Sequence, residues 1–370
     1  MVCSLFIASV PGLEDVVAQE LVSLGAPPGK VVPGGVAVEA DPSWVGVINR
    51  WSACATRVLL RVGAFRARHL SELHKKAGAL DWLGLIDRRP LRVRVTSHAS
   101  RLYHTGAVAE RIHSVLSDRA GRELSIVRGD ALPEDLSELQ TVFVRIEKDE
   151  VTISLDSSGD HLHRRGYRKR TAKAPLRENL AAAFLRLTGW PEPGVLLDPL
   201  CGSGTIPIEA ALLASGSAPG AGRRFAFEHW GEGWDHEMAP PAPRPDIRVF
   251  ARDRDRGAIE ATLANAEQAG VAAMIEAEVG SISGATRVSE QGLLLTNPPY
   301  GRRIGKKDPL RDLYASLGRI VRERFGGWRA CVVCGRPELM RACGMPFEAR
   351  TGPLDHGGLS IRLYEPSLRS

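Results

Sequence analysis

The order of hydrophobic and polar residues predicts that short strands and helices alternate through residues 1–62. Strand segments show a period of two and helical segments place apolar side chains on one face. We expect a small α+β region with an antiparallel sheet. The predicted elements are strands at 2–8 and 57–62, a glycine-interrupted hairpin at 31–39, and helices at 12–24 and 43–51.

The same patterns continue through residues 63–160 and predict a second α+β region. The next segment, residues 161–176, differs because its polar residues are almost all basic. Residues 161–177 contain seven Lys or Arg and no acid. A charge run of this kind is typical of a solvated linker, and it also suits contact with phosphate groups. The predicted elements of 63–160 are strands at 91–97, 142–147 and 151–155, and a helix at 105–116.

From residue 177 onward, apolar runs alternate regularly with amphipathic segments, which predicts a parallel sheet of the Rossmann-like α/β class. A Gly/Pro-rich insertion at 215–245 interrupts this alternation and is expected to be partly mobile. The predicted strands are 195–198, 247–252, 275–279, 293–297 and 330–333, and the predicted helices are 176–188, 206–214, 255–269 and 310–325.

Two polar motifs follow predicted strands of this region. The first runs from Asp198 to Thr205 and contains Gly202 and Gly204. Glycines there permit a tight turn and close approach of a ligand to the backbone, and ligands bind at the carboxyl ends of parallel strands. No Lys follows the glycines, so the motif is not a phosphate-binding P-loop. An acid at the start of the loop suits a zwitterionic amino-acid group. Asp253, which ends the next strand, is placed to accept both hydroxyls of a ribose.

The second motif is Asn297, Pro298, Pro299 and Tyr300, after the strand predicted at 293–297. Consecutive prolines cannot continue a central strand, so backbone carbonyls are left free. The Asn297 side chain and the Pro298 carbonyl can then both accept hydrogen bonds from an exocyclic amine. Tyr300 can stack on a base that has been turned out of its helix. The motif therefore predicts chemistry on the amine of a nucleobase.

Charge and cysteine content narrow the functional class. The net charge of +6 and pI near 9.1 suit a polyanionic partner without proving one. Six scattered cysteines favour a reducing, cytoplasmic compartment over a disulfide framework. Cys331 and Cys334 lie in a predicted strand with no second ligand pair, so we expect core packing and no metal site. No apolar run is long enough to span a membrane, and no signal peptide is predicted.

In combination, the two motifs resemble the signature shared by N6-adenine and N2-guanine amino-methyltransferases. Residues 155–168, 174–178, 265–270 and 351–355, together with the N-terminus, further resemble the THUMP-domain RNA N2-guanine methyltransferases. Within that family the chain is most similar to the branch that acts on large-subunit (23S) ribosomal RNA. The resemblance covers nearly the whole chain.

The resemblance implies an N-terminal ferredoxin-like region (1–62), a THUMP RNA-binding domain (63–160), a basic linker (161–176) and a Rossmann-like methyltransferase domain (177–370). It implies S-adenosylmethionine as the cofactor and RNA as the partner. Relatives often carry an Asp for the adenine amine where this chain has Ser281. The implied site residues are, for catalysis, Asn297, Pro298, Pro299 and Tyr300; for the cofactor, Pro175, Asp198, Pro199, Cys201, Gly202, Ser203, Gly204, Thr205, Asp253, Ser281 and Asn297; and for RNA, Arg164, Arg165, Arg168, Lys169, Arg170 and Lys173.

Three alternatives stay open. The same chemistry on transfer RNA is the nearest, because related THUMP enzymes methylate a guanine of the acceptor stem. DNA adenine methylation is more distant, since the N-terminal region resembles RNA enzymes. A non-catalytic RNA-binding assembly factor is the third, although such a protein has no need for both motifs.

Overall fold

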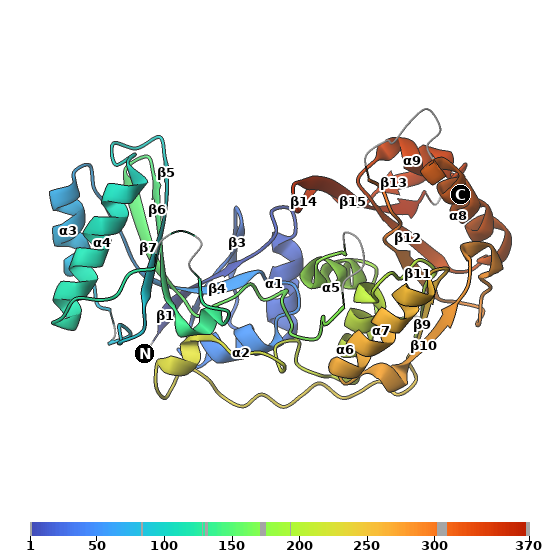
Figure 1. Ribbon diagram of the computed structural model, residues 1–370, viewed down its shortest axis with the longest axis horizontal. Helices are drawn as coiled ribbons and strands as arrows, with labels where there is room; N and C mark the ends of the chain where they lie inside the picture. The colour runs from blue at the N-terminus through green and yellow to red at the C-terminus, as the bar shows by residue number, and fades with distance from the viewer. Residues whose placement is uncertain are drawn as a thin grey trace. The chain divides into compact units, whose positions relative to one another are not determined.

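The computed structural model describes residues 2–82, 84–127, 129, 132–170, 175–192, 194–301 and 309–367. The chain divides into two compact units, each with its own sheet (Figure 1). The first unit comprises Met1–Ser9, Val17–Leu162 and Arg223–Met238. The second comprises Val10–Val16, His163–Gly222 and Ala239–Ser370.

The first unit is built on one seven-stranded sheet with the order β2-β3-β1-β4-β7-β6-β5. Neighbouring strands are antiparallel except β5 and β6, which are parallel. The strands are β1 (Cys3–Ala8), β2 (Lys30–Val32), β3 (Gly35–Ala40), β4 (Arg57–Arg66), β5 (Leu91–His98), β6 (Gln140–Glu147) and β7 (Glu150–Asp156). The helices are α1 (Glu14–Ser23), α2 (Trp44–Trp51), α3 (Leu70–Gly78) and α4 (Thr105–Ala120).

The strands of the predicted N-terminal α+β region are part of a larger sheet. The strand predicted to end at residue 62 continues to Arg66, with a bulge between Arg61 and Gly63. This longer β4 pairs with β7, and the register runs from Leu59 opposite Asp156 to Arg66 opposite Glu150. The strands of both predicted regions therefore form a single sheet. Pairing between segments about a hundred residues apart leaves no signal in local periodicity.

The insertion at 215–245 includes a segment that packs on the first unit. This segment contains a 3₁₀ helix, Ala226–His229, in which the Phe227 amide donates to the Ser157 carbonyl at 3.0 Å. Further along, the Gly46 amide donates to the Trp234 carbonyl at 2.8 Å, and Arg50 pairs with Asp235. Part of the predicted mobile insertion therefore belongs to the first core.

The second unit has the predicted Rossmann-like architecture. Its eight-stranded sheet has the order β10-β9-β8-β11-β12-β15-β13, with β14 paired to β15, and the first five strands of this order are parallel. Figure 1 shows α6 and α7 on one side of the sheet and α8 and α9 on the other. The strands are β8 (Val195–Asp198), β9 (Arg248–Asp253), β10 (Ile275–Val279), β11 (Leu293–Thr296), β12 (Arg329–Cys334), β13 (Phe347–Ala349), β14 (Leu354–His356) and β15 (Leu359–Pro366). The helices are α5 (Glu178–Leu187), α6 (Thr205–Ser215), α7 (Arg256–Gln268), α8 (Pro309–Arg324) and α9 (Pro337–Ala342).

The strand order reverses between β8 and β11, since β9 and β10 lie on one side of β8 while β11 and β12 lie on the other. Such a reversal creates a crevice at the carboxyl ends of the strands, where open α/β folds bind ligands. Short, fully buried strands position this crevice: Leu293, Leu294 and Leu295 of β11 are at most 1% exposed. These buried hydrophobic strands therefore place the polar loops that follow them at the carboxyl edge of the sheet.

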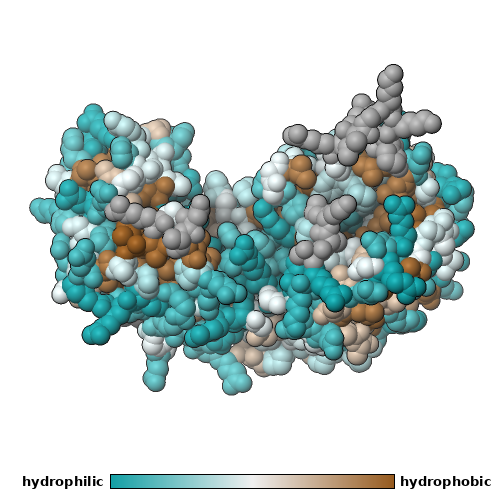
Figure 2. Space-filling model, viewed as in Figure 1, coloured by the Kyte–Doolittle hydropathy of each residue, from teal (hydrophilic) through white to brown (hydrophobic). Residues whose placement is uncertain are grey.

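The surface and cysteines agree with a globular protein. Figure 2 shows hydrophilic residues over most of the visible face of both units. No described helix combines the length and apolarity needed to cross a bilayer. All six cysteines are buried, and Cys331 and Cys334 lie within β12.

Candidate active site at the switch point

Hydrogen bonds join the two predicted motifs at the carboxyl edge of the second sheet. The Thr296 hydroxyl, at the end of β11, donates to Asp198 Oδ1 at 2.6 Å. On the other side, the Gly202 amide donates to Asp253 Oδ2, at the end of β9, at 3.0 Å. Because β9, β8 and β11 are adjacent and parallel, the structure brings Asp198, Asp253 and Asn297 to one edge.

Asp198 is a buried carboxylate with no cation within ion-pair distance among the described residues. Its Oδ1 accepts from the Leu200 amide at 3.1 Å and from Thr296. Burial raises the pKa of Asp198 to about 7, and the hydrogen bonds from Thr296 and Leu200 only partly oppose this shift. An ammonium group brought by a ligand would stabilise the ionised form.

The glycine loop between β8 and α6 depends on left-handed backbone at Gly202 (φ 56°) and Gly204 (φ 84°). A Cβ on Gly204 would lie 2.7 Å from Thr262 Cγ2 of α7, so a side chain there is excluded by strain and by contact. Thr262 in turn donates to the Gly202 carbonyl at 3.0 Å. Pro199, Cys201, Ser203 and Thr205 of the same loop are buried.

The sequence reading missed the residue that anchors this loop, Asn265 of α7. Its Nδ2 donates to the Ser203 carbonyl at 3.1 Å and to the Arg170 carbonyl at 2.9 Å. Its Oδ1 accepts from the amides of Lys169 and Arg170. Asn265 therefore links the glycine loop to the basic segment. Its only sequence signal was its presence in one of the family-like stretches.

Asp253 and Ser281, which were both predicted to contact the adenosine of the cofactor, differ in exposure and in hydrogen bonding. Asp253 is partly exposed, and its carboxylate accepts from the amides of Gly202 and Asp255. A carboxylate has further lone pairs, so it can still accept from ribose hydroxyls. The Ser281 hydroxyl is exposed and shares a hydrogen bond of 2.8 Å with Ser283. Ser281 thus offers an exposed hydroxyl at its predicted position.

The Asn-Pro-Pro-Tyr motif follows β11 directly. Asn297 Oδ1 is buried and accepts no hydrogen bond from any residue that the structure describes. Pro298 is buried, Pro299 is exposed, and the Tyr300 hydroxyl is buried without a described partner. Burial, with a smaller contribution from Cys334, raises the pKa of Tyr300 to about 12. A buried acceptor without a donor is costly in a folded protein, so Asn297 Oδ1 is a candidate acceptor for a donor group of a ligand.

Two arginines of the basic segment form ion pairs within the second unit, which the sequence did not predict. Arg165 is buried and pairs with Glu209 of α6 at 3.5 Å, while the Tyr167 hydroxyl donates to the same carboxylate at 3.0 Å. Burial raises the pKa of Glu209 to about 7. Arg168 binds Glu178 at 2.8 Å. These two arginines lie inside the second unit, where acids contributed by α5 and α6 compensate them.

The other predicted RNA contacts differ from Arg165 and Arg168 in exposure. Arg164, Lys169 and Arg170 are exposed. Lys173 lies outside the described residues. Pro175 is described and partly exposed, and its backbone is hydrogen-bonded to His356.

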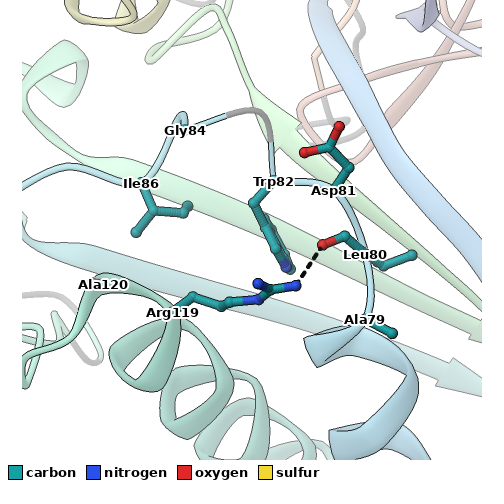
Figure 3. A pocket seen from close by; sticks show the side chains of 8 residues that line it. All are labelled: Ala79, Leu80, Asp81, Trp82, Gly84, Ile86, Arg119 and Ala120. Atoms are coloured by element: carbon teal, nitrogen blue, oxygen red, sulfur yellow. Dashed lines mark hydrogen bonds between the residues drawn. The ribbon is translucent and has the colours of Figure 1, made fainter.

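A cavity of about 410 Å³ lies in the first unit, beside α3 and α4 (Figure 3). It contains none of the predicted site residues. Arg119 donates to the Leu80 carbonyl at 3.2 Å, and the Trp82 indole donates to the Ala77 carbonyl at 3.1 Å.

The fold and this edge define a class I methyltransferase domain preceded by a ferredoxin-like region, and comparisons with known proteins agree. Residues 165–364 match the model of the RMKL-like methyltransferase domain, and residues 4–59 match that of the RlmL ferredoxin-like domain. The chain therefore belongs to the RMKL-like methyltransferase domain family.

One curated relative is the ribosomal RNA large subunit methyltransferase K/L of Syntrophotalea carbinolica. It is 37% identical over 381 residues, which cover 97% of this chain and 53% of the relative. The chain thus spans about half the length of the curated relative it matches.

Two solved structures match nearly the whole chain. A predicted N6-adenine-specific DNA methylase from Listeria monocytogenes str. 4b F2365 is 29% identical with a TM-score of 0.84, covering 99% of this chain and 97% of its own. A methyltransferase structure, SMU.472, complexed with SAH is 25% identical with a TM-score of 0.82, covering 100% and 99%. All three relatives have names that describe methyl transfer, and the two names that give a substrate differ, one being ribosomal RNA and the other DNA.

Proposed function

We propose that this chain transfers a methyl group from S-adenosylmethionine to the exocyclic N2 amine of a guanine in RNA, with 23S ribosomal RNA as the substrate. The family and the relative named for large-subunit ribosomal RNA support this assignment. The observation that carries it is the buried Asn297 Oδ1, an acceptor without a described donor at the switch point.

The residues at the edge fit the cofactor. Asp198 offers a buried carboxylate that lacks a described cation, which suits the ammonium of an amino acid. Asp253 offers carboxylate oxygens for the ribose, and the glycine loop permits close approach of a ligand. When bound, S-adenosylmethionine supplies an electrophilic methyl group on a sulfonium.

Asn297 and Pro298 orient the amine that receives the methyl group. The N2 amine of guanine is a poor nucleophile because its lone pair is delocalised into the ring. Two acceptors, Asn297 Oδ1 and the Pro298 carbonyl, would accept hydrogen bonds from its two N–H groups and favour a pyramidal nitrogen, whose lone pair is less delocalised into the ring. Tyr300 packs against the base. Catalysis then rests mainly on positioning, with no covalent enzyme intermediate.

RNA is held by residues outside this edge. The exposed Arg164, Lys169 and Arg170 contact phosphates, and the region 63–160 recognises RNA as a THUMP domain. The protein acts in the cytoplasm. Phosphate contacts imply that RNA affinity falls steeply with salt, because counterions are released on binding.

The test is product identification. The purified chain is incubated with labelled S-adenosylmethionine and, separately, with protein-free 23S ribosomal RNA, total transfer RNA and DNA from a strain that lacks the gene. Mass spectrometry of the nucleosides is expected to show N2-methylguanosine in ribosomal RNA alone. The same product in transfer RNA alone would assign the other substrate, and N6-methyladenine in DNA would overturn the proposal. Asn297→Ala protein in the same reactions controls for a contaminating enzyme.

A further inference from the structure

The guanidinium of Arg168 uses its nitrogen atoms unequally. Nε donates to Glu178 Oε1 at 2.8 Å, and Nη2 donates to the Leu176 carbonyl and the Thr205 hydroxyl, both at 3.0 Å. Nη1 is buried and finds no acceptor among the described residues. An arginine cannot shed its proton to relieve this, so the free N–H group is left for an incoming acceptor.

The position of this guanidinium indicates what that acceptor is. Leu176 and Glu178 lead into α5, and Thr205 is both the last residue of the glycine loop and the first of α6. Asp198 stands at the other end of the same loop. The loop therefore has a carboxylate without a described cation at its start and an N–H donor without a described acceptor at its end.

We propose that Arg168 binds the carboxylate of the cofactor's amino-acid end while Asp198 takes its ammonium. The two unsatisfied groups match the two charges of a zwitterion in sign, and guanidinium is the side chain best suited to a carboxylate. This inference rests on the proposed function, because it assumes an adenosyl amino acid in the site. It also reassigns Arg168 from the RNA contacts to the cofactor.

A purely structural role makes a different prediction. As a brace, Arg168 would act only through Leu176, Glu178 and Thr205, and its loss would disturb every ligand of the loop equally. As a carboxylate-binding residue, it would affect only ligands that carry a carboxylate. Ligands that differ in this one group therefore separate the two roles.

The experiment measures binding of three ligands to the full chain by titration calorimetry. S-adenosylhomocysteine has both charged groups, decarboxylated S-adenosylhomocysteine keeps only the ammonium, and 5′-methylthioadenosine has neither. Arg168→Met is expected to weaken the first by about tenfold to a hundredfold, as for a charged hydrogen bond, and the other two by less than about twofold. Arg168→Lys keeps the charge without the planar fork, and should lose less of the same preference.

Arg165→Met is the matched control, since it removes another buried arginine of the same unit that pairs with Glu209. Any effect it has should be equal for the three ligands. Equal weakening of all three by Arg168→Met, or equal affinity of the wild-type chain for all three, overturns the inference but leaves cofactor binding intact. Failure of the wild-type chain to bind any of them overturns the proposed function itself.

Discussion

Two asparagines, one in each unit, differ in the hydrogen bonding of their buried side-chain oxygen. Asn49, in α2 of the first unit, donates from Nδ2 to the Val45 carbonyl and the Ser157 hydroxyl, both at 2.8 Å. Its Oδ1 accepts from the Ser158 hydroxyl at 2.6 Å. Asn297 of the second unit has a buried Oδ1 with no described donor. The two asparagines therefore differ in whether their buried side-chain oxygen has a hydrogen-bond donor.

Two arginines repeat this contrast. Arg57, in β4 of the first unit, directs Nη1 to Asp156 and to the Gly159 carbonyl. Arg168 of the second unit keeps Nη1 unused among the described residues. Buried polar atoms without a partner occur in both units, so such an atom indicates a ligand site only where it lies beside the switch-point loops.

The largest expected effect is on methyl transfer in Asn297→Ala. Loss of one preorganised polar contact to the reacting group should lower the single-turnover rate by about a thousandfold. Affinity for S-adenosylhomocysteine should stay within about twofold, because Asp198 and Asp253 are intact. Retained turnover would contradict the role of Asn297 in orienting the amine.

Asp198→Asn should have the next largest effect, on cofactor affinity. The amide oxygen can still accept from Leu200 and Thr296, but the charge is gone. We expect S-adenosylhomocysteine to bind about tenfold to a hundredfold more weakly at pH 8, measured by calorimetry. Stability of the ligand-free chain should rise, since a buried charge without a described cation is removed. Unchanged affinity would exclude the ammonium contact.

A smaller effect is the pH dependence of binding. With a pKa of about 7, Asp198 is largely protonated at pH 6 and ionised at pH 8, so affinity for S-adenosylhomocysteine should rise several-fold across this range. Its contribution to the stability of the ligand-free chain has the opposite sign. The folded state holds the proton more tightly than the unfolded state. The free energy of unfolding therefore falls as the pH rises from about 4 to about 7.

Thr296→Val sharpens this prediction. It removes a hydrogen bond that lowers the pKa of Asp198, so the rise in affinity should move to higher pH. Calorimetric titrations from pH 6 to 8.5 on both proteins measure the shift. A pH profile that is the same in Asp198→Asn as in the wild-type chain would show that another group titrates.

The smallest effect is expected for Tyr300→Phe. The hydroxyl is buried without a described partner, so its removal should change the melting temperature and kcat/KM by little, within about twofold for the latter. Tyr300→Ala should lose much more activity, because the ring that packs against the base is gone. A loss of tenfold or more in Tyr300→Phe would assign the hydroxyl a direct contact with the base.

Much of the second unit could be predicted from the sequence. The strand that ends at Asp198 and the switch-point loop follow from apolar runs bounded by glycine and proline, and the structure places Asp198, Asp253 and Asn297 at one edge as expected. Parallel strands bring the ends of their loops together without any information on side-chain contacts, which is why local patterns were sufficient there.

The remainder depends on contacts between distant segments. Arg165 and Arg168 lie in a run of basic residues that is typical of a solvated linker, and nothing in that run predicts their ion pairs with Glu209 and Glu178. The anchoring role of Asn265 likewise needs three partners that converge in space. Local periodicity gives no information about contacts between residues that are far apart in the sequence. For the same reason it did not predict the pairing of β4 with β7.

The most direct test of the contrast between paired and open polar atoms is the free energy of unfolding of Asn49→Ala beside Asn297→Ala, from urea denaturation without ligand. We predict that Asn49→Ala costs about 2–3 kcal/mol, because it leaves buried partners unsatisfied. Asn297→Ala should change stability by less than about 0.5 kcal/mol, or increase it. An equal loss in both variants would mean that Asn297 supports the fold, and would contradict its assignment to the substrate amine.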